Sequence, residues 1–410
     1  MLSVAEALQL VLANAGVLPW REVPLAEALG LVLAADIASD IDSPPHDKSI
    51  VDGYAIIAET IRSSAEELVV LEEVTAGALP TQAVRPGTAT RIMTGAPLPD
   101  GADAVVMVEK TEQIANSNGQ RVRICECPVR AGQNIARRAS SLSRGDVVLR
   151  SGKLIRAIEI GLLAEVGKAG VPVHPRASVA VIATGNELVA PDRKPAPSEI
   201  RNSNGPMLAA LVAQAGGVPI ELGIARDTEA SLREKIETGL TSDILILSGG
   251  VSAGVLDLVP QVLSELGVEQ IFHKVDLKPG KPLWFGKRIA GDKTTLVFGL
   301  PGNPVSSLVC FELFVRPAIA RLAGRNPAGL RERTARLSAE HRQRGERPTY
   351  WPARLETSSN GSTVTPLAWK GSGDLRTLTD ADCLAFFPAG DRVFAAGEGV
   401  VVLRLAGAMD

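Results

Sequence analysis

Hydrophobic runs and helix-like segments alternate along residues 177–322, and each of four short apolar runs is followed by apolar positions with helical spacing. The runs are SVAVIAT, VPIELGI, DILILS and TTLVFG, and the helical stretches after them cover residues 205–215, 228–239, 255–266 and 304–321. Such alternation predicts a doubly wound parallel sheet with right-handed connections. The ligand site of such a sheet is expected at the carboxyl ends of its strands.

Helical spacing also occurs before this region. Residues 3–15 and 154–166 have apolar positions on one helical face, and Ser3 with Glu6 predicts a capping box at the start of the first segment. The segment PLAEALGLVLAADI, residues 24–37, is read as a further helix.

The rest of the chain has the pattern of β-structure. Short β-type runs separated by Gly and Pro predict a mostly-β insert, and the strand-like runs after Pro327 predict a small C-terminal β-domain. The chain therefore divides into a helical and linker domain from residues 1–45 and 146–174, the insert from 46–145, an α/β domain from 175–326 and a C-terminal β-domain from 327–410.

The composition narrows the classes of function. The 410 residues carry a formal charge of −3 and 3% aromatic side chains, which argues against a nucleic-acid binder. Four cysteines and four histidines provide no zinc tetrad, and so few thiols fit a reducing cytosol. No apolar run approaches the ~18 residues of a membrane span, and no signal peptide is visible. We expect a cytoplasmic protein that binds neither nucleic acid nor a membrane.

Glycine-rich and acidic loops follow the predicted strands, so they should converge on one edge of the sheet. Such loops expose backbone N–H groups that attract anions, and Lys278 and Lys281 on a Pro-Gly loop suit a phosphate or oxyanion. Glu187, Asp227 and Asp257 lie among these loops and suggest a Mg²⁺ ion that bridges acids and phosphates. The alternative is that these acids cap helices and that the glycines only satisfy turn geometry.

One motif offers a different chemistry. Residues 250–254 match G-x-S-x-G between a predicted strand and helix, as in a serine hydrolase with Ser252 as nucleophile. Only His273 and His341 follow as candidate bases, and the latter lies outside the α/β region. Walker A and the Rossmann glycine fingerprint are both absent.

A set of short motifs occurs in order along essentially the whole chain. They are VDGYA at 51–55, RIMTGAP at 91–97, GQNI at 132–135, TGNEL at 184–188, SGGVSAG at 248–254, KPGKP at 278–282, LPGNPVS at 300–306 and GS at 371–372. Each motif alone is weak evidence, but together they resemble the molybdopterin molybdotransferase family, which includes MoeA and the gephyrin E domain.

The resemblance implies an elongated, multidomain subunit that forms a homodimer. Its α/β domain would have the molybdopterin adenylyltransferase fold, and that adenylyltransferase would be a partner. The implied reaction ligates molybdate to adenylylated molybdopterin and releases AMP, which yields the molybdenum cofactor.

The resemblance also implies roles for individual residues. Asp52 and Thr94 would face the active cleft of the partner subunit, and Ser372 would reach in from the C-terminal domain. The acids Glu187, Asp227 and Asp257 would lie at a Mg²⁺ ion, and Lys278 and Lys281 would hold oxyanion or phosphate. The substrate cradle would consist of Thr184, Gly185, Ser248, Gly249, Gly250, Ser252, Pro301, Gly302, Asn303 and Pro304.

The chain departs from the family pattern at a few positions. Ser140 and Ser141 replace two carboxylates, Ser49-Ile50-Val51 stands for Ser-Ala-Met, and Asn186 stands where Asp is common. Losing negative charge beside a metal or oxyanion site changes metal affinity. A divergent paralogue that binds molybdopterin without turnover is therefore an alternative, and the choice between molybdate and tungstate stays open.

Overall fold

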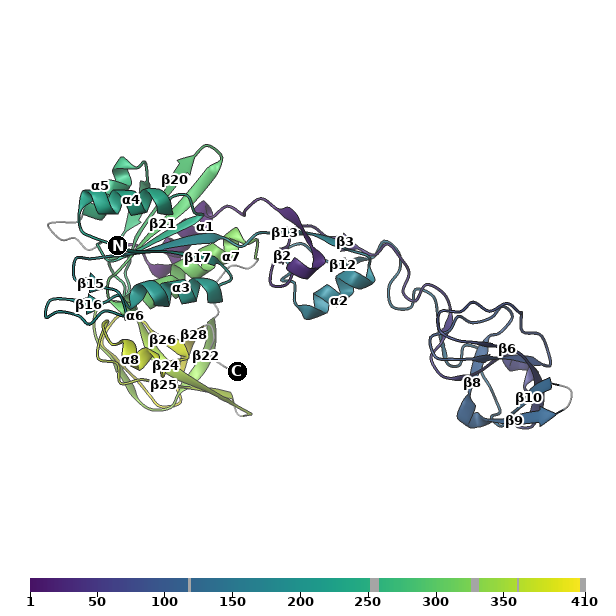
Figure 1. The fold of residues 1–410 in the computed structure, drawn as a ribbon. Coiled ribbons are helices and arrows are strands. Elements are labelled where there is room, and N and C mark those ends of the chain that lie inside the picture. The colour runs from purple at the N-terminus through teal and green to yellow at the C-terminus, as the bar shows by residue number, and fades with distance from the viewer. Residues whose placement is uncertain (117–118, 251–257, 326–331, 360, 406–410) are drawn as a thin grey trace. The chain divides into compact units, whose positions relative to one another are not determined.

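The computed structural model describes residues 1–410 except 117–118, 251–257, 326–331, 360 and 406–410. The chain forms two compact units (Figure 1). The first contains residues 1–35, 151–157 and 170–410, and the second contains residues 36–150 and 158–169.

A six-stranded sheet in the order β17-β14-β18-β21-β20-β19 forms the centre of the first unit. Four of its strands are parallel: β14 (Ser178–Thr184), β17 (Val218–Ala225), β18 (Ile244–Ser248) and β21 (Lys293–Leu300). Antiparallel β19 (Glu269–His273) and β20 (Trp284–Ala290) extend one edge. The chain adds β17 on one side of β14 and β18 on the other, so the topological switch point lies between β14 and β18.

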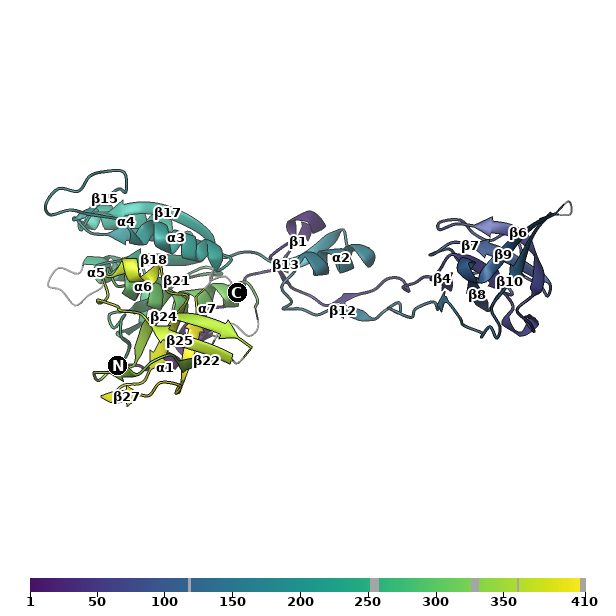
Figure 2. The same ribbon diagram turned by 90° about the horizontal axis from the view of Figure 1, so that it is seen from below.

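The central strands β14 and β18 are buried on both faces, and their successive side chains point to opposite faces of the sheet. In β14, Val179 and Val181 pack into one cluster, whereas Ala180 and Ile182 pack into the other. The helices form two layers, which lie above and below the sheet in Figure 1, and Figure 2 gives the view from below. The first contains α1 (Val4–Asn14), α3 (Asn204–Gln214), α6 (Pro304–Cys310), the π-helical turn η4 (Phe311–Val315) and α7 (Arg316–Leu322), and the second contains α4 (Glu229–Gly239) and α5 (Leu258–Glu265). The doubly wound sheet and the Ser3–Glu6 capping box of α1 are confirmed.

A closed barrel in the order β22-β25-β24-β26-β28 forms the C-terminal part of the first unit, which confirms the β-domain predicted there. Its elements are β22 (Glu332–Leu337), β24 (Thr349–Ser358), β25 (Gly361–Pro366), β26 (Cys383–Phe387) and β28 (Gly399–Arg404), with the pair β23 (His341–Gln343) and β27 (Arg392–Phe394) and the helix α8 (Leu375–Leu378) beside them.

Burial of His341 in β23 is expected to make the stability of the protein depend on pH. Its ring stacks on Phe387 at 4.1 Å, and burial lowers the pKa of the imidazole below 6.5. The unfolded chain therefore binds the proton more readily, so the stabilisation is complete above pH 6.5 and declines as the pH falls toward the folded pKa. We expect the wild type to lose more stability between pH 8 and pH 5.5 than His341→Phe, measured by urea denaturation. Equal losses in both proteins would contradict this role.

The helix predicted for residues 24–37 is wrong. Only a single 3-10 turn forms there, η1 (Leu25–Glu27), and it is followed by the short strands β2 (Val32–Leu33) and β3 (Ile37–Ala38). The strand β2 pairs with β13 (Gly170–His174), which also pairs with β1 (Arg21–Pro24). Two further strands, β15 (Leu188–Val189) and β16 (Ile200–Arg201), pair with each other.

The second unit contains a six-stranded sheet in the order β8-β5-β7-β6-β10-β9, which confirms the mostly-β insert. Its strands are β5 (Gly53–Ile56), β6 (Glu66–Val74), β7 (Thr88–Ile92), β8 (Ala104–Met107), β9 (Thr111–Asn116) and β10 (Gly119–Ile124). The smaller elements are β4 (Lys48–Ser49), β11 (Ile135–Ala136), β12 (Val147–Leu149), η2 (Ala58–Thr60), η3 (Val108–Lys110) and α2 (Ala157–Glu165). Within the described ranges of the chain, no helix has the length and hydrophobicity that a membrane crossing requires.

Candidate functional site

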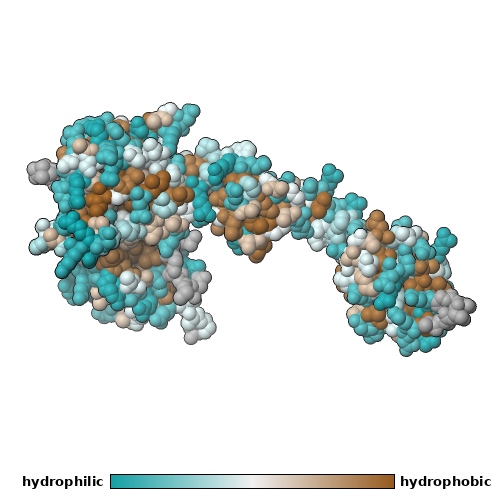
Figure 3. Space-filling model, in the orientation of Figure 1, coloured by the Kyte–Doolittle hydropathy of each residue, from teal (hydrophilic) through white to brown (hydrophobic). Residues whose placement is uncertain are grey.

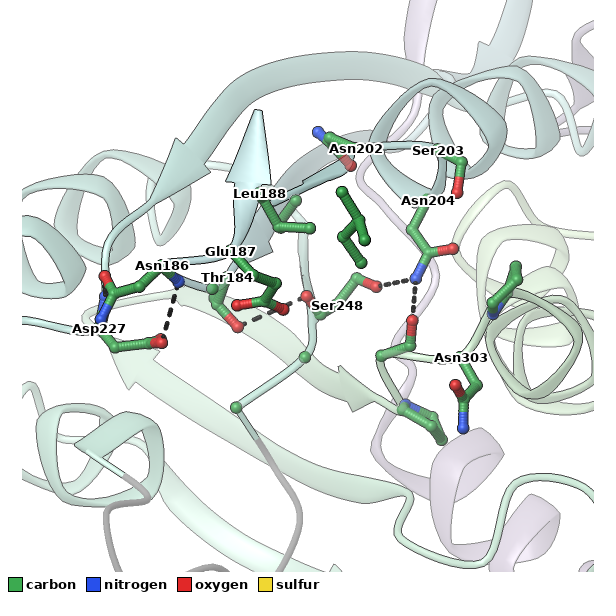
Figure 4. Close-up of a pocket in the computed structure, with 18 of the residues that line it drawn as sticks. Thr184, Asn186, Glu187, Leu188, Asn202, Ser203, Asn204, Asp227, Ser248 and Asn303 are labelled. Atoms are coloured by element: carbon green, nitrogen blue, oxygen red, sulfur yellow. Dashed lines mark hydrogen bonds between the residues drawn. The ribbon is translucent and has the colours of Figure 1, made fainter. Parts of the chain in front are cut away.

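A cavity of about 990 Å³ opens at the carboxyl ends of β14, β18 and β21 (Figure 4). It lies at the topological switch point of the sheet, which is where open α/β sheets bind ligands. Strand-end loops, the start of α3, the strand β16 and the loop before α8 contribute its walls. The lining residues are Ala183, Thr184, Gly185, Asn186, Glu187, Leu188, Ile200, Arg201, Asn202, Ser203, Asn204, Asp227, Leu232, Ser248, Gly249, Gly250, Leu258, Val259, Pro282, Pro301, Gly302, Asn303, Pro304, Gly373 and Leu375.

Gly249 lets two strand ends approach closely at the floor of this cavity. Its N–H donates to the carbonyl oxygen of Leu300 at 3.0 Å, and its φ is +100°. A Cβ at this position would lie 2.7 Å from the carbonyl oxygen of Thr184. The hydroxyl of Thr184 in turn donates to the carbonyl oxygen of Ser248 at 3.4 Å. Glycine is therefore required here for both conformation and space.

The amide of Asn204 joins the end of β18 to the loop after β21. Its Nδ2 donates to the hydroxyl of Ser248 at 2.8 Å and to the carbonyl oxygen of Gly302 at 2.7 Å. The sequence analysis missed this residue. The only available signal was an asparagine at the start of a predicted helix, a position where asparagine is common for local reasons.

The acidic side of the cavity is built from two loops that hold each other. The backbone N–H of Asn186 donates to Asp227 Oδ2, and the N–H of Asp227 donates to Asn186 Oδ1, both at 3.1 Å. Arg226 Nη1 donates to the carbonyl oxygens of Asn186 and Leu188 at 3.0 Å each. Asn186, at a position where aspartate is common in the resembled family, thus carries no charge but forms hydrogen bonds that align the two loops. Arg226 fixes the backbone of the loop from Asn186 to Leu188.

Glu187 lies over Gly185, which precedes it by two residues. A Cβ on Gly185 would come within 2.5 Å of a Glu187 carboxylate oxygen, so a side chain at that position would displace the carboxylate. Figure 4 draws the Glu187 carboxylate and the Thr184 hydroxyl among the groups that line the cavity. The cavity therefore has carboxylate oxygens from Glu187 and Asp227 in its wall.

These two acids are the described part of the predicted magnesium cluster. The third acid, Asp257, lies outside the described residues. Among the side chains that the structure describes, no group of three or more His, Cys, Asp or Glu residues could hold a metal ion. Glu187 and Asp227 still offer hard oxygen donors, which are the ligands that Mg²⁺ prefers.

The predicted lysines lie beside the cavity and do not line it. Pro282 of their loop is a lining residue, whereas Lys278 and Lys281 are not. The backbone of Lys278 is held by the barrel, because its N–H donates to the carbonyl oxygen of Pro348 and its carbonyl accepts from Tyr350, both at 2.9 Å.

The predicted substrate residues fall into three groups. Ser252 and the rest of the serine-hydrolase motif after Gly250 lie outside the described residues, and neither His273 nor His341 lines the cavity. Ser372 does not line it either, but its carbonyl oxygen accepts the N–H of Val305 at 3.1 Å, which brings the barrel loop to the start of α6. The structure brings together Thr184, Gly185, Ser248, Gly249, Gly250, Pro301, Gly302, Asn303 and Pro304.

Asp52 and Thr94 form a pair in the second unit. The backbone N–H and the hydroxyl of Thr94 both donate to Asp52 Oδ1 at 2.7 Å. These two hydrogen bonds, the backbone one first, hold the pKa of the Asp52 carboxyl below its usual value. Asp52 is therefore a fixed negative charge at neutral pH.

Ser140 and Ser141 also belong to the second unit, in a turn whose Ala139 has φ +59°. The N–H of Ser140 donates to the carbonyl oxygen of Arg137 at 3.1 Å. The neighbouring arginine Arg138 donates through Nε to Asp42 at 2.6 Å. The carboxylate next to this turn therefore comes from Asp42, which is paired with Arg138, and the turn positions themselves carry hydroxyls.

Family comparisons cover nearly the whole chain. Residues 2–167 match the MoeA N-terminal region (domains I and II), and residues 180–321 match a probable molybdopterin binding domain. Residues 334–405 match the MoeA C-terminal region (domain IV). The cavity described above lies largely in the second of these regions.

Individual relatives agree over similar lengths. A molybdopterin molybdenumtransferase from Staphylococcus aureus (strain MRSA252) is 34% identical over 408 residues, which cover 98% of this chain and 94% of the relative. One from Nostoc sp. (strain PCC 7120) is 37% identical and covers 93% and 88%. A crystal structure of the molybdopterin biosynthesis MoeA protein from Pyrococcus horikoshii has a TM-score of 0.84 at 33% identity, covering 98% and 99%.

Proposed function

Because the chain belongs to the MoeA family of molybdopterin molybdenumtransferases, which are transferases of molybdenum cofactor biosynthesis, we propose that it ligates molybdate to adenylylated molybdopterin and releases AMP. The observation that carries this proposal is the cavity at the switch point, which lies in the region that matches a molybdopterin binding domain. Its volume of about 990 Å³ suits a ligand that contains both a pterin and a nucleotide.

The residues of the cavity act mainly by binding and orientation. Both substrates are anions, so the glycine loops and the Ser248 hydroxyl would supply hydrogen-bond donors to their oxygen atoms. Arg226 and the Asn186–Asp227 pair keep the strand-end loops rigid, so these donors stay in place. Rigid positioning of two reactants lowers the entropic part of the barrier.

We include Mg²⁺ in this proposal. Glu187 and Asp227 would hold the ion through carboxylate oxygens, together with Asp257. When bound, Mg²⁺ would offset the negative charge of the phosphate and molybdate oxygens. Lys278 and Lys281 would add positive charge beside the cavity. Ser372 would contribute to substrate binding from the barrel loop that contacts α6.

The proposal extends to the assembly. A homodimer is supported by family membership and by an exposed apolar surface on α2, where Ile158 is 74% exposed and hydrophobic residues gather in Figure 3. Asp52 and Thr94 would then serve the cavity of the partner subunit. Molybdopterin adenylyltransferase is the proposed donor of substrate, and the cytoplasm the proposed location, supported by four free cysteines.

Release of AMP tests the reaction. Wild-type protein with adenylylated molybdopterin, molybdate and Mg²⁺ should release AMP, measured by chromatography. Glu187→Gln should raise the Mg²⁺ concentration needed for half-maximal rate by about 10- to 100-fold, because the amide keeps an oxygen atom but loses the negative charge of the ligand. Tight binding of the pterin without AMP release would favour the paralogue without turnover. Labelling of Ser252 by a fluorophosphonate would instead support the hydrolase.

Glu221 provides the matched control for this assay. It is an exposed carboxylate on β17 and does not line the cavity. Glu221→Gln should leave both the rate and the Mg²⁺ dependence as in the wild type. A similar shift in both variants would show that general loss of charge, and not a ligand role of Glu187, explains the effect.

A further inference from the structure

Asn204 uses both protons of its amide nitrogen within the protein. The residue is 8% exposed and begins α3. One proton goes to the Ser248 hydroxyl and the other to the Gly302 carbonyl, and Figure 4 shows the amide between the two. The amide nitrogen therefore has no proton left for a ligand.

This arrangement fixes the direction of the Ser248 hydroxyl proton. A hydroxyl group has one proton and accepts through two lone pairs. Since Asn204 Nδ2 only donates, Ser248 accepts on that side and its own proton points elsewhere. Ser248 lines the cavity, and in the described part of the chain no group accepts this proton. The proton is thus available to an acceptor in the cavity.

The oxygen of the Asn204 amide shows that the surrounding groups fix the orientation of this side chain. Asn204 Oδ1 is buried and accepts no hydrogen bond from the described residues. Turning the amide by half a turn would place this oxygen against the Gly302 carbonyl oxygen, so the assignment of the two atoms is fixed. A buried acceptor without a partner reduces stability, and such groups occur where a site has a function.

We propose that Asn204 is a positioning residue that makes Ser248 a hydrogen-bond donor toward the cavity and thereby selects a ligand with a phosphate oxygen at that point. The inference deepens the proposed function and rests on it, because adenylylated molybdopterin and AMP both carry phosphate. A purely structural Asn204 would tie two loops together, and its loss would affect binding independently of Ser248.

A double-mutant cycle separates these two roles. AMP binding to the full-length chain is measured by isothermal titration calorimetry for the wild type, Asn204→Ala, Ser248→Ala and the double variant. Ser248→Ala should weaken binding by about tenfold, and Asn204→Ala by less. The double variant should bind no more weakly than Ser248→Ala, because Asn204 acts through Ser248.

A pair of isosteric variants tests the polarity directly. In Asn204→Asp a carboxylate would accept the Ser248 proton and turn it away from the ligand, so AMP binding should fall at least as far as in Ser248→Ala. Asn202→Asp is the matched control, because Asn202 is also 8% exposed and lines the same cavity. Its Oδ1 accepts the N–H of Gly205 at 2.9 Å, and aspartate keeps that bond. Asn202→Asp therefore measures only the effect of the added negative charge on AMP binding.

The outcomes distinguish this inference from the proposed function. The role of Asn204 would be overturned if the double variant lost AMP affinity by the product of the two single losses. Equal losses of AMP affinity in Asn204→Asp and Asn202→Asp would overturn it as well. In either case, AMP release by the wild type would still support the proposed function. Coupled losses in a protein that releases no AMP from adenylylated molybdopterin would keep the inference and reject the function. A wild type that binds no AMP would overturn both. If Asn204→Asp does not fold, judged by circular dichroism, the alanine cycle decides.

Discussion

Substitution of Arg316 by methionine is expected to lower the free energy of unfolding by about 3–5 kcal/mol. Arg316 donates to the Glu312 carboxylate through two nitrogens, at 2.6 and 2.8 Å. The Glu312 side chain is 2% exposed, and it belongs to the π-helical turn η4 in the main core. Removing the arginine leaves a buried negative charge without its partner. This unpaired charge lowers the free energy of unfolding far more than the loss of the arginine's packing contacts does.

The double variant Glu312→Leu/Arg316→Met is the informative control. Replacing both members of a buried ion pair by apolar side chains of similar size is often close to neutral. We therefore expect the double variant to recover most of the stability lost in Arg316→Met, measured by urea denaturation monitored by circular dichroism. A double variant as unstable as the single one would show that the loss arises from packing and not from the uncompensated charge.

Substitution of Gly249 by alanine is expected to reduce AMP release by about 100-fold. The new Cβ would lie 2.7 Å from the Thr184 carbonyl oxygen, and the left-handed φ of +100° is strained for any residue with a side chain. The ends of β14 and β18 must then move apart, which displaces the groups that line the cavity. The strain should also lower the free energy of unfolding by about 1–3 kcal/mol.

Gly302 offers a matched substitution in the same cavity. A Cβ there would meet its nearest neighbour, the Cα of Gly249, at 3.7 Å, which is an ordinary contact. Gly302→Ala should therefore keep the stability of the wild type within about 1 kcal/mol. Gly249→Ala with AMP release within threefold of the wild type would contradict the packing argument.

The strands and helices of the α/β domain could be predicted from the sequence because both faces of the sheet are buried. In the run SVAVIAT the five positions between Ser178 and Thr184 are all apolar, and the helices between such runs have one apolar face. Burial on both faces is a property of each segment, so local patterns report it. The boundaries of the four parts of the chain stay a prediction.

The segment 24–37 shows where local patterns fail. Its apolar spacing favours a helix, but Val32 and Leu33 pair with β13, which lies far along the chain. Gly30 at φ +77° turns the chain before that strand. Strand pairing with a distant partner outweighs helix propensity, and nothing within the segment reveals the partner.

The candidate site likewise has features that could be predicted from the sequence and others that could not. The glycine and acidic loops could be placed at one sheet edge from the sequence, because each follows a strand of a predicted parallel sheet. The sequence did not indicate that Asn204 bridges Ser248 and Gly302, or that Asn186 and Asp227 hold each other. These contacts join segments that are distant in the chain, and their geometry depends on how the strands pack.

The sequence by itself thus determined the class of fold, the alternation of strands and helices in the α/β domain and the strand-end loops that line part of the cavity, because periodicity, glycine and charge act within short segments. Only the tertiary structure decided which polar groups in those loops hold one another and which keep a proton for a ligand. A hydrogen bond depends on the distance and direction between two atoms, and packing sets both.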